Sequence, residues 1–204
     1  MERKNLWEEV YKTKLSEAVS WYQPHLTKSL ELIAASGIDR NANIIDVGGG
    51  ASTLADVLLV NGYKRITVLD ISSKAIEVSK RRLDNKADQI AWVEADILEV
   101  EFPKDSFDLW HDRAVFHFLT NPADRKRYIN TLRDSLRFGG NVILSTFGLN
   151  GPSKCSGLDV IRYDSQSLSK ELGNAFGLTD SLTEKHTTPR GMSQEFIFCR
   201  FKKI

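Results

Sequence analysis

Three aspartates lie at or beside the ends of short apolar runs: Asp46, Asp70 and Asp96. Asp46 comes just before a glycine turn at residues 48–50, and the other two follow the next two apolar runs. A carboxylate in such a place can accept hydrogen bonds from the hydroxyl or amino groups of a ligand, and glycines let the backbone approach that ligand closely. The pattern therefore indicates a polar ligand that spans three neighbouring strand ends.

The glycine turn differs from the one that binds dinucleotides. Counted from Gly48, the dinucleotide pattern has its second glycine at Gly50, but Thr53 occupies its third glycine position. The carboxylate of Asp46 would also repel a pyrophosphate, whereas it would attract an ammonium group. The turn therefore favours a ligand with a cationic end.

The other two aspartates suit a nucleoside. Asp70 follows Asp46 by 24 residues, close to the spacing of about twenty at which a carboxylate accepts hydrogen bonds from ribose hydroxyls. Ile71 would pack on a purine face. Asp96 would accept from an exocyclic amine while the backbone N–H of Ile97 donates to a ring nitrogen. Together these residues predict an adenosine site.

These residues need elements that place them at one edge. Nearly continuous apolar runs predict buried strands, and apolar residues at helical spacing predict helices between them, with Ser72 or Ser73 as a helix cap. The alternation predicts a doubly wound α/β fold with a parallel sheet. The expected strands are Asn43–Val47, Arg65–Asp70, Ile90–Glu94, Phe107–Trp110 and Asn141–Phe147, and the expected helices are Thr53–Leu59, Ser73–Leu83 and Arg125–Leu136.

The C-terminal part departs from this alternation. Leu178–Glu184 and Gln194–Phe201 read as two strands with no helix between them, which predicts an antiparallel hairpin. In the last strand, Phe196 and Phe198 would face one side while Ile197, Cys199 and Phe201 face the other. Both faces are apolar, so we expect this strand to lie inside the sheet.

Residues 46–52, Asp70-Ile71 and Asp96-Ile97 resemble the three motifs of the class I S-adenosylmethionine-dependent methyltransferases, over roughly residues 40–204. The resemblance implies a Rossmann-like, seven-stranded sheet with an antiparallel C-terminal hairpin. It also implies that the first motif, with Asp46, Gly48 and Gly50, holds the methionine part of S-adenosylmethionine, the second the ribose and the third the adenine. One departure is Ser52, which replaces the third glycine of the family's usual turn.

The N-terminus adds a narrower resemblance. Trp7, Tyr11 and Trp21 look like the aromatic lid residues of the elongation factor and citrate synthase lysine methyltransferases, and Arg113 matches a basic cofactor-contacting position of that subgroup. Residues 1–30 would then form a helical lid within one domain. Trp7 and Tyr11 share a helix face, so the alternative is ordinary packing of an amphipathic helix.

Methyl transfer is an in-line displacement, so the protein must align the nucleophile and control its proton. His111, Asp112 and His117 follow the fourth strand and are the candidate catalytic residues. Either histidine would serve as a base, and Asp112 would orient an amine or pair with Arg113. The alternative for each histidine is a structural role in the core.

The acceptor stays open. The Asn/Asp-Pro-Pro-aromatic signature of methylation on bases or glutamine is absent after the fourth strand. The subgroup resemblance suggests a protein lysine as the acceptor. The compact chain, without a separate domain for docking a protein, suggests a small molecule. We expect the loop Gly148–Tyr163, with Cys155, to form part of the acceptor pocket. The segment His186-Thr187-Thr188-Pro189 carries no decisive signal.

Composition limits the remaining classes. The chain has 204 residues, enough for one substantial core, and its net charge of +1 gives no general attraction to nucleic acid. No long apolar run is present, only two cysteines occur, and the His and Cys residues lack metal-ligand spacing. We therefore expect a single-domain cytoplasmic protein without metal. Two alternatives stay open, a nicotinamide-dependent oxidoreductase and a noncatalytic module that binds S-adenosylmethionine.

Overall fold

The computed structural model describes residues 2–13, 19, 22–23, 26–189 and 191–204. Its elements, in chain order, are α1 (Glu2–Thr13), α2 (Thr27–Ala35), β1 (Asn43–Val47), α3 (Leu54–Val60), β2 (Arg65–Asp70), α4 (Ser73–Leu83), η2 (Asp84–Gln89), β3 (Ile90–Glu94), β4 (Phe107–Arg113), η3 (Phe116–Phe118), α5 (Pro122–Ser135), β5 (Leu136–Phe147), β6 (Lys154–Cys155), β7 (Leu158–Asp159), α6 (Ser165–Leu172), β8 (Phe176–Thr187) and β9 (Ser193–Lys203).

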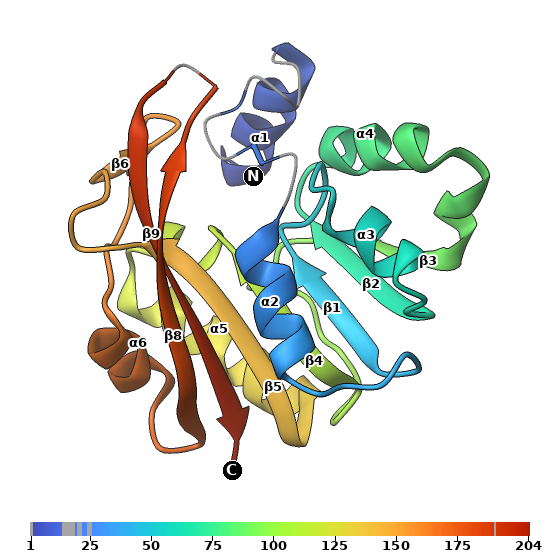
Figure 1. Ribbon diagram of the computed structural model, residues 1–204. Helices are drawn as coiled ribbons and strands as arrows, with labels where there is room; N and C mark the ends of the chain where they lie inside the picture. Colours follow the sequence, from blue (N-terminus) through green and yellow to red (C-terminus); the bar gives the residue numbers. More distant parts are fainter. Residues whose placement is uncertain (1, 14–18, 20–21, 24–25, 190) are drawn as a thin grey trace.

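The main sheet has seven strands in the order β3-β2-β1-β4-β5-β9-β8 (Figure 1). Strands β1 to β5 run parallel, whereas β9 is antiparallel to β5 and β8 is antiparallel to β9. The doubly wound fold with an antiparallel hairpin is therefore confirmed, and β9 lies inside the sheet as predicted. The strand order reverses between β1 and β4, the place where open α/β sheets bind ligands.

Two hydrophobic cores cover the two faces of the sheet. One core packs side chains of α5 and α6, such as Tyr128 and Leu168, against Ile45 and Trp110. The other packs α2 and α3 against the opposite face, where Ile44 and Leu109 point. The last strand contributes to both cores: Ile197, Cys199 and Phe201 to the first, and Phe196 and Phe198 to the second. This division confirms the predicted alternation along β9.

The predicted bounds of β1, β2, β3 and α4 are confirmed, and the Ser72 hydroxyl caps α4 by accepting from the backbone N–H of Ala75. Other predicted bounds were off by one to five residues, those of α3, α5, β4, β5, β8 and β9. Strand β4 continues to Arg113, and β5 begins at Leu136 directly after α5. The early start of β5 depends on its partner strand. Phe107 of β4 pairs with Leu136 across a local irregularity, so β5 begins five residues before the predicted start at Asn141.

The segment after β5 was predicted as a loop, but it contains the short antiparallel pair of β6 and β7. Its end is tied back to the sheet, since the backbone N–H of Tyr163 donates to the carbonyl of Phe147. The N–H of Ile161 donates to the carbonyl of His117. These bonds tie the segment back to η3 and to the end of β5.

Candidate functional site

Two adjoining cavities lie at the carboxyl ends of the parallel strands. The large cavity encloses about 820 Å³ including its open mouth, and the small cavity about 520 Å³. Both are lined by Tyr11, Val47, Gly48 and Arg113, so they meet at the end of β1. Of the predicted cofactor residues, Asp70, Ile71, Asp96 and Ile97 line the large cavity and Asp46 lines the small one.

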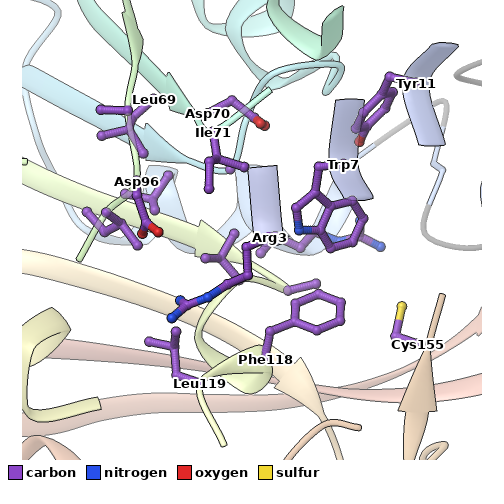
Figure 2. A pocket seen from close by; sticks show the side chains of 17 residues that line it. Arg3, Trp7, Tyr11, Leu69, Asp70, Ile71, Asp96, Phe118, Leu119 and Cys155 are labelled. Carbon is purple, nitrogen blue, oxygen red and sulfur yellow. The ribbon is translucent and has the colours of Figure 1, made fainter. Parts of the chain in front are cut away.

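Figure 2 shows the large cavity with two unlike walls. Leu69, Asp70, Ile71 and Asp96 form one side, and Phe118, Leu119 and Cys155 form the other. Arg3 and Trp7 of α1 lie between these walls. One wall therefore carries the predicted nucleoside contacts, while the facing wall is apolar and comes from segments that follow β4 and β5.

The glycine turn after β1 has no room for side chains. A Cβ on Gly48, whose φ is +72°, would lie 2.1 Å from Val115 Cγ2. On Gly49 it would lie 2.2 Å from Asp46 Oδ2, and on Gly50 it would lie 2.6 Å from Asp70 Oδ2. Sequence reasoning singled out Gly48 and Gly50 but missed Gly49. The run of three consecutive glycines was the signal that would have included it.

Asp46 is held by a buried chain of polar groups. Its Oδ1 lies 2.7 Å from His111 Nδ1, and His111 Nε2 lies 2.9 Å from the hydroxyl of Ser29. The other oxygen, Asp46 Oδ2, is buried without a hydrogen-bond partner among the described residues. Since Asp46 lines the small cavity, this carboxylate fits an ammonium group there.

His111 lines the small cavity, but its contacts favour a positioning role over the expected role as a base. Its side chain is 1% exposed, and Asp46 and Ser29 occupy its two ring nitrogens. A base must be able to reach the proton that it removes. His111 instead orients Asp46, because strand β4 lies beside β1 with the two residues in register.

Asp70 joins two parts of the backbone around the large cavity. Its Oδ2 accepts from the N–H of Gly50 at 3.0 Å, and its Oδ1 accepts from the N–H of Ser72 at 2.8 Å. Burial raises the pKa of Asp70 to about 6, although these two hydrogen bonds act in the opposite direction. One side chain therefore fixes both the glycine turn and the start of α4.

Asp96 and Ile97 lie in the turn after β3 and line the large cavity, as does Ile71 after β2. Asp96 Oδ1 accepts from the N–H of Leu98 at 2.9 Å, which orients the carboxylate. The structure thus brings the predicted ribose and adenine residues to one cavity. Their contacts with a ligand stay predictions.

Asp112 does not pair with Arg113 as one expectation had it. Its carboxylate accepts from the hydroxyl of Tyr128 at 2.6 Å and from the N–H groups of Val115 and Phe116. Burial raises its pKa to about 6 against these hydrogen bonds. Because side chains alternate along β4, Asp112 points into the core behind the cavities and holds the turn that follows the strand.

His117 is also not placed as a base. Burial lowers its pKa to about 3, with a further contribution from the charge of Arg113. Its Nδ1 accepts from the N–H of Phe147 at 3.3 Å. A group with so low a pKa takes up almost no proton near neutral pH, so His117 is a structural residue and the expectation is corrected.

Arg113 lies where the two cavities meet, as its predicted contact with the cofactor requires. Its guanidinium carbon is 5.0 Å from the centre of the Phe196 ring. Burial lowers its pKa to about 10, while Glu184 and Asp46 favour the charged form. Arg113 therefore carries a positive charge at neutral pH.

Trp7 and Tyr11 of α1 both line the large cavity. Trp7 packs edge-on against Phe118 with ring centres 5.2 Å apart. Trp21, the third predicted aromatic, lies outside the described residues. Helix α1 thus covers the cavity with the two aromatics that the sequence placed on one helix face.

Glu8 attaches α1 to the start of α4. Its carboxylate accepts from the N–H and hydroxyl of Ser73, the N–H of Lys74 and the hydroxyl of Ser72. Burial alone would raise the pKa of Glu8, but these hydrogen bonds outweigh it and the pKa is lowered. Two exposed ion pairs add to the attachment: Lys4 with Glu94 at 2.5 Å and Arg3 with Asp124 at 2.9 Å.

Sequence reasoning missed three polar residues beside the small cavity. Gln23 lines this cavity, and its amide nitrogen lies 2.9 Å from Glu184 Oε2 and 3.2 Å from His186 Nδ1. The only signal in the sequence was the segment around His186, and the sequence did not indicate where this segment lies in the fold. The long β8–β9 hairpin carries Glu184 and His186 up to the site.

Within the described ranges, no group of three His, Cys, Asp or Glu side chains is arranged to hold a metal ion. No helix in these ranges is both long enough and apolar enough to cross a membrane.

Comparisons with known sequences match this site to a family. Residues 44–140 match the family described as methyltransferase domain. The malonyl-[acyl-carrier protein] O-methyltransferase of Paenibacillus sp. (strain JDR-2) is 33% identical over 129 residues, which cover 58% of this chain and 46% of that protein. The eEF1A lysine and N-terminal methyltransferase of Bos taurus is 26% identical over 120 residues, which cover 59% of this chain and 17% of that protein. The match thus spans less than half the length of these relatives.

A solved structure shows the same fold. The N-methyltransferase NodS from Bradyrhizobium japonicum WM9, in complex with S-adenosyl-L-homocysteine, superposes with a TM-score of 0.71 at 17% identity. The superposition covers 96% of this chain and 97% of that one. The sheet with its antiparallel end is therefore the fold of that methyltransferase.

Proposed function

We propose that this chain, whose residues 44–140 match a methyltransferase domain, binds S-adenosylmethionine across both cavities and transfers its methyl group. One observation carries the proposal. The carboxylates of Asp46, Asp70 and Asp96 lie at or just beyond the carboxyl ends of three neighbouring parallel strands and line two cavities that meet at Gly48. This arrangement suits a ligand with an ammonium group at one end and adenosine at the other.

The residues fit the parts of S-adenosylmethionine one by one. The unpaired oxygen of Asp46 would accept from the ammonium group, and Asp70 would accept from the ribose hydroxyls. Asp96 and the backbone of Ile97 would bind the adenine, with Ile71 against its face. When bound, the cofactor supplies a methyl group activated by a sulfonium sulfur.

The chain's own contribution is to position the acceptor and to exclude water. Tyr11, Gly48 and Arg113 line both cavities, so the reacting groups would meet beside them. Helix α1 covers this place and is held there by Glu8 and by the packing of Trp7 against Phe118. Holding two reactants in line contributes much of the acceleration in such a displacement.

We propose a small molecule as the acceptor. The wall facing the nucleoside residues is apolar and enclosed, with Phe118, Leu119 and Cys155 below α1. A lysine of another protein is the second candidate, which Trp7 and Tyr11 favour because aromatic rings can guide an aliphatic lysine chain.

Binding and turnover test the proposal separately. We expect calorimetry to detect binding of S-adenosylhomocysteine and no binding of NAD. A nicotinamide-dependent enzyme would give the reverse result. Labelled methyl from S-adenosylmethionine should then enter a cell lysate in the presence of the protein, in the small-molecule fraction if the first acceptor is right and in a protein band if the second is.

The control for that assay is the double variant Asp46→Ala, Asp70→Ala, which should transfer no label. Binding of S-adenosylhomocysteine without any transfer would favour the noncatalytic module.

A further inference from the structure

The side-chain amide of Gln23 is held in one orientation by two partners on the β8–β9 hairpin. Its nitrogen lies 2.9 Å from Glu184 Oε2 and 3.2 Å from His186 Nδ1. Glu184 and His186 are two apart on β8 and share one face of the strand. His186 is buried, with its ring edge-on to Phe196.

The chemistry of these partners fixes which amide atom faces which way. A carboxylate only accepts hydrogen bonds, so the amide nitrogen and not its oxygen must face Glu184. That nitrogen carries two hydrogens, one directed at Glu184 and one at His186 Nδ1. The carbonyl oxygen of Gln23 is left as the acceptor that this side chain offers to the small cavity, which it lines.

The surroundings of this oxygen favour a positively charged or hydrogen-donating group. Two carboxylates, Glu184 and Asp46, act on the single positive charge of Arg113 where the cavities meet, which leaves a net negative charge there. A second amide oxygen, Gln194 Oε1, is buried on the same hairpin without a hydrogen-bond partner among the described residues. Gln194 pairs in register with His186.

We propose that Gln23, held by Glu184 and His186, positions the acceptor, and that the nucleophile of the acceptor is an amine. This inference rests on the proposed function and names the acceptor class of the same site. A neutral amine can donate an N–H to Gln23 Oε1 while its lone pair points at the methyl carbon. The methylated nitrogen is positively charged, and the amide oxygen with Glu184 behind it would stabilise that charge.

A pair of cofactor analogues tests the role of Gln23 without knowledge of the acceptor. Sinefungin carries an amino group on a carbon in place of the methylsulfonium, whereas S-adenosylhomocysteine has a bare thioether there. In Gln23→Met, which keeps the side-chain length, we expect sinefungin to bind roughly tenfold more weakly, the effect of losing one charge-assisted hydrogen bond. Binding of S-adenosylhomocysteine should stay within about twofold.

Three results decide the matter. Selective loss of sinefungin affinity supports the proposal. Equal loss for both ligands overturns it, because Gln23 would then bind the methionine end, and unchanged affinity for both overturns it as well. A wild-type protein that binds neither analogue would instead contradict the proposed function itself.

Two further variants test the proposal even if Gln23→Met does not fold. Glu184→Gln retains an oxygen that accepts from Gln23 but removes the charge, so sinefungin affinity should fall by a smaller factor in the same direction. Thr183→Ala, on the exposed face of β8, is the matched control and should leave both affinities unchanged. If Glu184→Gln loses no more sinefungin affinity than Thr183→Ala does, the proposed role of Glu184 in holding Gln23 is overturned.

Discussion

The two halves of the site are built in different ways. The proposed cofactor half comes from three successive strand ends between residues 46 and 97. Backbone N–H groups hold the carboxylates of Asp70 and Asp96, and the side chain of His111 holds Asp46. The proposed acceptor half joins α1, Gln23 and the β8–β9 hairpin, segments far apart in the chain, through contacts between side chains. The glycine turn of the first half leaves no room for a side chain, whereas the second half depends on single polar contacts that can be removed one at a time.

The largest effect should come from Gly48→Ala in the cofactor half. A residue other than glycine at φ +72° costs about 1–3 kcal/mol, and its Cβ would also lie 2.1 Å from Val115 Cγ2. We expect loss of S-adenosylhomocysteine binding in calorimetry and a lower melting temperature. Gly62→Ala is the matched control, since Gly62 has φ +82° with nothing within 4 Å of a Cβ. Equal effects of the two substitutions would show that the turn is less crowded than described.

His111→Ala comes next, because it leaves both Asp46 and Ser29 buried without their partner. Each unsatisfied buried group costs about 1–3 kcal/mol, so the free energy of unfolding should fall by about 3 kcal/mol. Affinity for S-adenosylhomocysteine should fall too, as Asp46 loses its orientation. Denaturant unfolding and calorimetry measure both. Wild-type stability and affinity with lost turnover would restore His111 as the base.

A pH titration of cofactor affinity isolates Asp70. Its pKa of about 6 is raised from an ordinary value of 3.8. Between pH 3.8 and pH 6, Asp70 is therefore mostly protonated in the folded protein and mostly ionised in the unfolded chain. This group therefore contributes less stability as pH rises from 3.8 to 6. Ligand binding has the opposite trend, because the charged carboxylate is the better acceptor for ribose hydroxyls, and affinity should fall roughly tenfold from pH 7 to pH 5.

Asp70→Asn should flatten that profile at a lower affinity. Asp112, whose pKa is also about 6, provides the control, since it lies behind the cavities and Asp112→Asn should leave the slope in place. A profile that flattens only in Asp112→Asn would remove Asp70 from the ribose site.

The smallest effect is expected from Glu8→Gln in the acceptor half. The substitution removes the charge that holds α1 to Ser72, Ser73 and Lys74, and should weaken this attachment by about 1 kcal/mol. We expect S-adenosylhomocysteine to dissociate several-fold faster in stopped-flow, and amide hydrogens of α1 to exchange faster. Glu9→Gln, one residue along on the exposed side, should change neither rate. Similar rates in Glu8→Gln and wild type would argue against a lid.

Predictions from the sequence succeeded where a short segment carries its own signal. The bounds of β1, β2 and β3 follow from apolar runs of five or six residues, and the cap at Ser72 follows from one residue beside a helix. They failed where a partner strand sets the bound, as at Leu136, where pairing with Phe107 extends β5. They did not foresee the burial of His111 and His117, because neighbours far along the chain determine it.

The sequence alone indicated where the cofactor half of the proposed site lies, since the aspartates and the glycine turn lie on consecutive βα units whose parallel order brings their ends together. Only the tertiary structure decided the acceptor half. Gln23 meets Glu184 and His186 across more than half the chain because the antiparallel hairpin turns back over the end of the sheet. Spacing in sequence cannot show such a meeting, because it depends on how two distant segments pack and on which side of β8 faces the cavity.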